Sequence, residues 1–455
     1  MTSTIRFYQL EQLSAEDRAA LLRRTESDLS NYLDAVRPII EAVRTQGDAA
    51  LLRYAREFDR AEVDPQRIKA GAADFDRAFQ RLQPDVLAAI EYAVNNIRRF
   101  HAAQKPEEMW LKEMHPGVFA GEKWLPIPSV ALYVPRGKGS FPSMVMMSAI
   151  PAVVAGVARI CIITPPGPDG EIDDATLVAA RLSGVDEVYK CGGAQGIAAV
   201  AYGTETVPRV DKVVGPGSPY VVAAKRLLSD VIDPGIPAGP SESIVLADST
   251  ANGALAALDL IIESEHGDDS SAYLVTDSRS VAEAAMREIP AFWGRMGQQR
   301  AGFSAAVLGG AQGGVILAPD MNEAIRFVND YAPEHLQILA AEPFQYLGRI
   351  TNAGEILLGE HTPSVIANFL LGPNAILPTG GAARTASPLS VFDFMKRSSV
   401  GYVTAGGYPE LAAHTRVLAR YEGFDGHANA VSELREQARQ QSNEPSASTD
   451  PVSQS

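Results

Sequence analysis

Acidic and imidazole side chains occur together at three places in the chain, where they could do acid–base or metal chemistry. The first is IIESEHGDDSSA, residues 261–272, in which Glu263 and His266 are three positions apart. On a helix these two side chains share one face, whereas Glu265 points elsewhere. A carboxylate oxygen and an imidazole nitrogen form half of a common zinc or manganese ligand set. Taken alone, the segment is more typical of a solvated helix end that stops at Gly267.

The second and third places lie farther along the chain. In NDYAPEHLQILA, Glu334 and His335 stand between a proline and a strand-like run. A histidine next to an acid is suited to proton abstraction near neutral pH. In RYEGFDGHANAV, Glu422 and His427 flank a glycine-containing turn. Each pair has a structural explanation by itself, but the three together favour a site.

Three glycine-rich turns follow strand-like runs directly. They are YVPRGKGSFP at 133–142, CGGAQG at 191–196 and VGPGSPY at 214–220. Glycine lets backbone amides approach a ligand closely, and a helix that starts at once offers its N–H groups to a phosphate. Any one of them could be an ordinary turn, but three so close together favour a nucleotide. The chain has no intact GxGxxG, GxxxxGK[ST] or GxSxG motif, so the usual dinucleotide, P-loop and hydrolase fingerprints are absent.

The elements that must position these residues alternate between strands and helices. From about residue 128, β-branched runs such as VALYV and ICIIT alternate with helical patterns, which predicts parallel sheets and an α/β fold. Residues 14–100 have a helical pattern and are predicted to be scaffold. The phrase GGAQG occurs at 192–196 and again at 309–313, which chance or a duplicated α/β unit would explain. The polar residues after about Leu434 are predicted to be disordered.

Composition restricts the class of protein. A chain of 455 residues with 46% hydrophobic residues predicts two or more domains. The formal charge of -15 disfavours nucleic acid and anionic membranes as partners. There is no signal-peptide pattern and no apolar run of about 18 to 20 residues, which predicts a cytoplasmic protein. Cys161 and Cys191 are too few for a disulfide framework or a thiolate metal site, and we expect both to be reduced and structural.

Five segments in one order resemble the histidinol dehydrogenase family. They are AGPSES at 238–243, ESEHG at 263–267, YAPEHL at 331–336, LPTGG at 377–381 and EGFDGHANAV at 422–431. The glycine-rich turns resemble the family's nucleotide-binding side, and the resemblance covers about residues 15–435. It implies two incomplete Rossmann-like domains with parallel sheets, a helical N-terminal region, and a small C-terminal extension exchanged in a homodimer.

The resemblance also implies domain boundaries. We expect an N-terminal arm over 1–25, a first α/β domain over 26–128 with 241–382, a second, NAD-side α/β domain over 129–240, a dimer-exchanged segment over 383–440 and a disordered tail over 441–455.

The family oxidises an amino alcohol to an amino acid with two NAD and one zinc ion. Carried over by position, the resemblance implies Glu334 and His335 as catalytic bases. It implies metal ligands at Glu263, His266, Asn368 and His427, for zinc or, as an alternative, manganese. It implies substrate contacts at Ser241, Glu263, His266, His335, Asn368, Glu422 and His427. It implies NAD contacts at Tyr133, Gln195 and Ser218.

Some positions depart from the family pattern. The chain has Glu263 where the family has Gln, and Asn368 where it has Asp, so the proposed ligand set keeps one formal negative charge and four N/O donors. The Asn of the family's GPGN turn is Ser218 here. The family's His after Asn374 is Ala375, and a lost polar contact commonly costs a factor of 10 to 10⁴ in substrate discrimination. We therefore expect a substrate other than histidinol.

These inferences predict an NAD-dependent, metal-assisted oxidation of a small primary alcohol, through the aldehyde to the carboxylate. The substrate would be an amino alcohol or a diol, and relatives of the family include a sulfopropanediol dehydrogenase. Histidinol dehydrogenase proper is one alternative. A catalytically silent relative that senses NAD or a metabolite is another, although the Glu334–His335 pair disfavours it. A purely structural α/β scaffold leaves the motifs unexplained.

Overall fold

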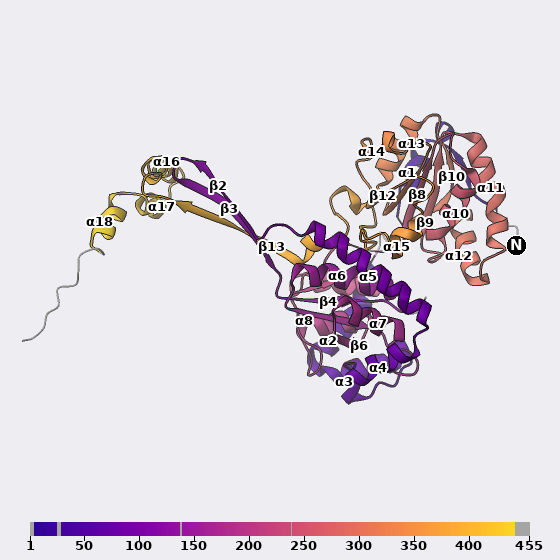
Figure 1. The fold of residues 1–455 in the computed structure, drawn as a ribbon, viewed down its shortest axis with the longest axis horizontal. Coiled ribbons are helices and arrows are strands. Elements are labelled where there is room, and N and C mark those ends of the chain that lie inside the picture. Colours follow the sequence, from indigo (N-terminus) through magenta and orange to yellow (C-terminus); the bar gives the residue numbers. More distant parts are fainter. Residues whose placement is uncertain (1–3, 25–28, 137–138, 238, 442–455) are drawn as a thin grey trace, which may run out of the picture. The chain divides into compact units, whose positions relative to one another are not determined.

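The protein is described by a computed structural model that covers residues 4–24, 29–136, 139–237 and 239–441. The chain divides into two compact units (Figure 1). The first comprises residues 1–105 and 126–395, and the second comprises residues 106–125 and 396–455. The predicted tail at 441–455 lies outside the described residues except for Gln441. The disorder predicted after about Leu434 is wrong as far as Gln441, because α18 (Glu433–Gln441) is a helix.

The first unit contains a four-stranded parallel sheet with helices on both faces. The strand order is β6 (Glu187–Lys190), β5 (Arg159–Thr164), β4 (Ser129–Tyr133) and β7 (Lys212–Val214). Successive side chains of β4 point to opposite faces, so Val130 and Leu132 join one core while Ala131 and Tyr133 join the other. This order, third-second-first-fourth in chain sequence, is that of half a Rossmann fold.

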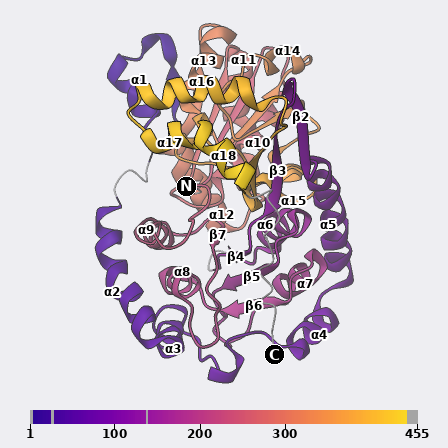
Figure 2. The ribbon, with the colours of Figure 1, turned by 90° about the vertical axis from the view of Figure 1, so that its left-hand side faces the viewer.

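Two groups of helices cover this sheet (Figure 2). One face is covered by α4 (Ala72–Arg81), α5 (Pro84–Gln104), α6 (Pro142–Ala155) and α7 (Asp174–Ser183). The other is covered by α2 (Ser30–Gln46), α3 (Asp48–Tyr54), α8 (Gly193–Tyr202) and α9 (Pro219–Leu227).

A second parallel sheet in the same unit has six strands. The order is β1 (Phe7–Gln9), β10 (Gly313–Leu317), β9 (Ser271–Thr276), β8 (Glu242–Ala247), β11 (His335–Leu339) and β12 (Glu355–Leu358). The cores on its two faces contain residues of α10 (Gly253–Ser264), α11 (Arg279–Trp293), α12 (Gln298–Gly309), α1 (Ala15–Leu21), α13 (Met321–Tyr331) and α14 (Phe344–Leu347). Helix α15 (Ser364–Phe369) follows β12 and contacts α10. The predicted α/β class with parallel sheets is confirmed.

The division of the chain differs from the expected boundaries in three ways. Residues 26–128 were expected to form one domain with 241–382. Helices α2 to α5 instead pack on the four-stranded sheet, which was expected to form the NAD-side domain without them. Residues 106–125 belong to the second unit. The expected N-terminal arm supplies β1, an edge strand of the six-stranded sheet. Helical periodicity indicates which face of a helix is buried, but it does not indicate which sheet covers that face.

The second unit is built from strands β2 (Met109–His115), β3 (Val118–Pro126) and β13 (Met395–Val403), in the order β13-β3-β2. Three helices follow, α16 (Tyr408–Tyr421), α17 (Asp425–Ala430) and α18 (Glu433–Gln441). Strands β2 and β3 form an antiparallel hairpin, and every residue of β2 is exposed. The short helical turns of the chain are η1 (Leu10–Gln12), η2 (Ala55–Asp59), η3 (Pro65–Arg67), η4 (Ala382–Arg384) and η5 (Val391–Phe394).

The structure also bears on the predictions about the cysteines, the GGAQG repeat and membrane-spanning segments. Both cysteines are buried and free, and burial raises the pKa of the Cys161 thiol to about 12. The first GGAQG phrase begins helix α8 and the second leads into strand β10, so the two occupy different places in the fold. Within the described ranges, no helix has the length and hydropathy needed to cross a bilayer.

Candidate active site

The predicted bases lie where three neighbouring strands of the six-stranded sheet begin. Glu334 immediately precedes β11, and His335 is its first residue. His335 is in register with Ser243 of β8 on one side and with Glu355 of β12 on the other. Parallel strands start at one edge of a sheet, so these residues converge there. This is the amino edge, whereas ligands of open α/β sheets usually bind at the carboxyl edge.

A left-handed residue directs the chain into β11. Ala332 ends α13 with φ 54° and is completely buried. A non-glycine residue in this conformation costs roughly 1 to 2 kcal/mol. Strain of this kind persists where surrounding structure enforces it, often at functional sites.

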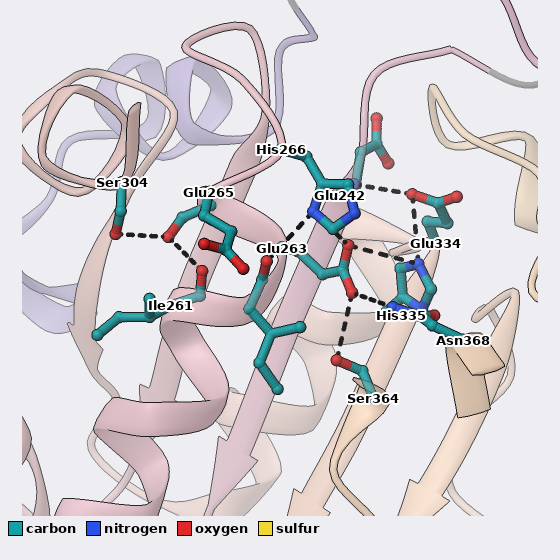
Figure 3. Close-up of polar contacts among 12 residues, drawn as sticks. Glu242, Ile261, Glu263, Glu265, His266, Ser304, Glu334, His335, Ser364 and Asn368 are labelled. Atoms are coloured by element: carbon teal, nitrogen blue, oxygen red, sulfur yellow. Dashed lines mark hydrogen bonds and ion pairs between the residues drawn. The ribbon is translucent and has the colours of Figure 1, made fainter. Parts of the chain in front are cut away.

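His335 is almost fully buried and has three carboxylates near it, of which Glu263 and Glu334 are drawn in Figure 3. Its Nδ1 atom is 2.5 Å from Glu355 Oε1. Its Nε2 atom is 3.7 Å from Glu334 Oε2 and 3.9 Å from Glu263 Oε2. Burial lowers the pKa of the imidazole, but the three carboxylates together outweigh burial and raise it.

Glu334 is held by the backbone of β8. Its Oε2 atom accepts a hydrogen bond of 2.9 Å from the Glu242 N–H. Burial raises the pKa of the Glu334 carboxyl, the nearby Glu263 and Glu242 add to this effect, and His335 opposes it. A carboxyl with a raised pKa can exchange a proton near neutral pH.

Glu263, His266 and Asn368, three of the four predicted metal ligands, lie close together (Figure 3). Asn368 Nδ2 donates to Glu263 Oε1 at 2.9 Å, and Ser364 Oγ donates to the same oxygen at 3.3 Å. His266 Nδ1 is 3.3 Å from Glu263 Oε2. Glu263 is 1% exposed, and burial raises its pKa, but His335, His266 and the hydrogen bonds from Asn368 and Ser364 together lower it by more.

These donors fit a divalent cation. Asn368 Oδ1 is buried and has no hydrogen-bond partner, and Glu263 Oε2 faces two imidazoles. An amide oxygen, a carboxylate oxygen and an imidazole nitrogen are all normal zinc or manganese ligands. In the described part of the chain, no group of three or more His, Cys, Asp or Glu side chains is placed to hold a metal ion. A site here therefore depends on the amide of Asn368 and on a further ligand.

The remaining predicted ligand, His427, and the predicted substrate contact Glu422 belong to the second unit. His427 lies on α17 with its ring 4.9 Å from that of Phe424, and Glu422 follows the last residue of α16. Both residues are exposed.

Ser241, the other predicted substrate contact, precedes β8. It lines a small pocket with Arg24, Pro240, Glu242, Asp269, Ser271 and Gly380. In this pocket Arg24 Nε is 2.7 Å from Glu242 Oε1, and its guanidinium lies 3.4 Å from the centre of the Tyr331 ring.

The predicted NAD contacts lie at the carboxyl edge of the four-stranded sheet, whereas the predicted bases lie at the amino edge of the six-stranded sheet. Tyr133 ends β4, Gln195 is in the first turn of α8 after β6, and Ser218 immediately precedes α9 after β7. Strands β4 and β7 are neighbours at the point where the strand order reverses, which is the usual dinucleotide position. Gly215 has φ 118°, and a Cβ there would be 2.2 Å from the Tyr133 carbonyl oxygen, so only glycine fits.

Ala375 is half-buried and packs against the hydrophobic core of α4 to α7. The preceding Asn374 donates to Met147 O at 2.5 Å and lies 3.4 Å from His101 Nε2. His101 is fully buried in α5, which agrees with a structural role.

Sequence reasoning missed three polar residues of this site: Glu355, Ser364 and Glu242. The sequence carried a weak signal for Glu355, because it is a charged residue at the start of the apolar run EILL. Its contact with His335 depends on strand register, which the local pattern does not define.

The histidinol dehydrogenase family model matches residues 22–435. The chain belongs to the histidinol dehydrogenase family. Members are NAD-dependent oxidoreductases that act on a CH–OH group and use a zinc ion.

Three members of the histidinol dehydrogenase family illustrate the range of sequence identity to this chain. "Histidinol dehydrogenase homolog 2" of Mesorhizobium japonicum is 61% identical over 434 residues, 95% of this chain and 99% of that protein. "Histidinol dehydrogenase" of Synechocystis sp. is 49% identical over 428 residues, 94% of this chain and 98% of that protein. The crystal structure of histidinol dehydrogenase from Elizabethkingia anophelis aligns with a TM-score of 0.90 at 31% identity, covering 96% of this chain and 99% of that one.

Proposed function

We propose that this protein oxidises a small primary alcohol, of the amino alcohol or diol type, through the aldehyde to the carboxylate with NAD. The observation that carries this proposal is the buried Glu334–His335 pair, with His335 Nε2 3.9 Å from the Glu263 carboxylate. A base next to a cation-binding group is suited to metal-assisted oxidation of an alcohol.

In the proposed reaction, His335 Nε2 takes the hydroxyl proton while the carbinol carbon loses hydride to NAD. Glu334 then assists the addition of water to the aldehyde, and a second hydride transfer gives the carboxylate. The raised pKa of Glu334 suits it to accept the proton of that water. Burial of both side chains excludes bulk water from the reacting groups.

Glu263, His266, Asn368 and His427 are the proposed metal ligands. A zinc or manganese ion bound by them would lower the pKa of the substrate hydroxyl. The orphaned amide oxygen of Asn368 and the ionised carboxylate of Glu263 support this assignment. Ser241 and Glu422 are the proposed further substrate contacts, and Tyr133, Gln195 and Ser218 the proposed NAD contacts.

Two observations favour a substrate other than histidinol. Ala375 presents an apolar side chain where the family has an imidazole. The relatives from Mesorhizobium japonicum and Cereibacter sphaeroides, at 61% and 63% identity, are named as homologs, whereas the chain from Synechocystis sp. named as the enzyme is 49% identical.

Oxidation of histidinol itself is the second candidate. The identity with the enzyme of Synechocystis sp. and the likeness to the solved structure favour it. A screen of NAD reduction with histidinol, amino alcohols, diols and sulfonated diols, with zinc or manganese present, separates the two. Two NADH for each alcohol are expected. One NADH with accumulating aldehyde would contradict the four-electron course. No reduction with any alcohol, and less than about a tenth of an equivalent of metal, would favour a silent relative.

We also propose that the protein is a homodimer with shared active sites. The second unit exposes large apolar side chains on α16 and in the turn that follows, among them Leu418 (63% exposed), Tyr421 (91%) and Phe424 (50%). Apolar groups exposed together favour contact with another protein surface. His427 of the partner subunit would then complete each metal site.

A further inference from the structure

Glu355 faces the candidate base from the neighbouring strand. It is the first residue of β12, in register with His335, and its Oε1 atom is 2.5 Å from His335 Nδ1. The two side chains are only 8% and 5% exposed. We propose that Glu355 is a positioning residue, which fixes the His335 ring with Nδ1 protonated and Nε2 directed at the substrate hydroxyl. This inference rests on the proposed function, in which His335 is the base.

The chemistry of the two partners defines which nitrogen carries the proton. An ionised carboxylate only accepts hydrogen bonds, so Nδ1 must be the donor in this contact. In the neutral imidazole, which is the form that acts as a base, the nitrogen left to accept a proton from a substrate is therefore Nε2. Nε2 is the atom that faces Glu334 and Glu263, at the centre of the proposed site.

Strand β12 also holds the backbone of the catalytic pair. The Glu355 N–H donates to the Glu334 carbonyl oxygen at 3.0 Å, and the Gly354 N–H donates to that of Pro333 at 2.9 Å. A Cβ at Gly354 would be 2.5 Å from the Glu334 carbonyl oxygen, so glycine permits this close approach. The side chain of Glu355 and the backbone at the start of β12 thus position both bases.

An ion pair with a purely structural role would not require one carboxylate on Nδ1 and the others on Nε2. Of the three carboxylates around His335, Glu334 and Glu263 approach Nε2, and Glu355 alone approaches Nδ1. A carboxylate behind an imidazole holds the ring orientation and stabilises the imidazolium formed on proton uptake, and in a serine protease its replacement by an amide lowers kcat about 10⁴-fold.

The kinetic test compares Glu355→Gln with Glu355→Asp in the metal-loaded dimer. Gln can either accept from or donate to Nδ1, so the tautomer is no longer enforced. We expect Glu355→Gln to lower kcat at least about 100-fold, with KM and metal content within about twofold of wild type. Asp restores the carboxylate and should recover part of kcat. Glu360→Gln removes a nearby exposed acid and should leave all values unchanged.

Two kinetic outcomes would overturn the proposal. One is a kcat of Glu355→Gln within twofold of wild type. The other is a loss of metal and of thermal stability that matches the loss of kcat in both variants, because that pattern indicates a structural role alone.

A spectroscopic test does not depend on turnover. The chain has seven histidines, so ¹⁵N-histidine labelling gives few signals, and those of His335 are identified by their loss in His335→Gln. We expect a strongly downfield, hydrogen-bonded Nδ1 proton in wild type and in Glu360→Gln, and its shift or loss in Glu355→Gln. An unchanged signal in Glu355→Gln would overturn the proposal. A wild type with this signal that oxidises no alcohol would instead contradict the proposed function and leave the positioning role intact.

Discussion

Glu263 is buried, yet hydrogen-bond donors and two imidazoles face its carboxylate and lower its pKa. Asn368 and Ser364 donate to Oε1, and His266 and His335 face Oε2. The amide of Asn368 thereby turns its Nδ2 to the carboxylate and leaves Oδ1 without a partner. A Gln with an Asp in these two places could make the same contact with donor and acceptor reversed. The two departures from the family pattern are thus coupled in space.

This coupling predicts the behaviour of three variants. Glu263→Gln removes the only formal charge of the proposed ligand set. Asn368→Asp places a second carboxylate against the buried carboxylate of Glu263 and removes a hydrogen-bond donor. We expect each single variant to lose metal affinity about tenfold or more, and the double variant to bind metal more tightly than either. Metal equivalents after dialysis against a chelator measure this.

The matched control for these variants is Glu265→Gln, two positions from Glu263. It should retain metal as wild type does, since Glu265 makes none of the contacts described for Glu263. Equal metal loss in both single variants and the double variant would contradict the inference that the carboxylate of Glu263 and the amide of Asn368 compensate for each other.

Ala332 offers a second test at a single residue. Its φ of 54° is tolerable for Ala and Gly, whereas a β-branched residue would be strained. We expect Ala332→Val to lower Tm by several degrees and kcat with it, because Glu334 and His335 follow directly. Ala332→Gly should stay within about 1 kcal/mol of wild type, since relief of strain and greater unfolded-state entropy oppose each other. A Val variant as stable and active as wild type would show that the turn is not constrained.

At the scale of elements, the two sheets of the first unit contribute opposite edges. The six-stranded sheet uses the amino ends of β8, β11 and β12, and the four-stranded sheet offers the carboxyl ends of β4, β6 and β7. A dinucleotide at the second edge follows the usual rule for parallel sheets. The acid–base groups at the first edge depend on the C-terminal end of α10, which returns to the amino ends of the strands.

The turn between β7 and α9 is held by a buried lysine. Lys225 Nζ donates to the Gly215 carbonyl oxygen at 2.7 Å, and burial lowers the pKa of this ammonium from 10.5 to about 7. Between these pH values the unfolded chain binds one more proton than the folded chain, so stability rises with pH across this window. Below about pH 7 the full cost of the buried charge is present, about 1.4 kcal/mol for each unit of pKa shift.

Lys225→Met removes this titration. We expect its Tm relative to wild type to be highest near pH 6.5 and to fall steadily towards pH 9.5, as the wild type gains stability. Arg226→Met, at the exposed next position of α9, should keep the wild-type pH dependence. Parallel Tm curves for Lys225→Met and wild type would show that the lysine does not titrate in this window.

Sequence patterns predicted those features that depend on neighbouring residues. The β-branched runs indicated parallel strands, and the spacing of Glu263 and His266 indicated a shared face. The contacts of Glu355 and Ser364 were missed because they depend on strand register and on the placement of α15 against α10. The membership of residues 106–125 in the second unit was missed for the same kind of reason, because these residues pair with a strand that begins at Met395.

At the scale of the whole molecule, the two units contain different parts of the proposed site. Glu334, His335 and Glu263 belong to the first unit, whereas Glu422 and His427 belong to the second. Exposed apolar residues on the second unit favour a protein contact there. In a homodimer with exchanged second units, His427 of the partner subunit would meet the bases of the first.

Complementation between two inactive variants tests this arrangement. Glu334→Gln and His427→Ala homodimers should each lose activity at least about 100-fold, since each lacks one essential group in both sites. In a heterodimer with exchanged segments, one site combines both lesions and the other has none. A purified heterodimer, with a different tag on each subunit, should therefore have about half the wild-type specific activity, and a randomly exchanged equal mixture about a quarter. If each site were built within one chain, every site of the heterodimer would carry one lesion, and the heterodimer would be as inactive as its parents.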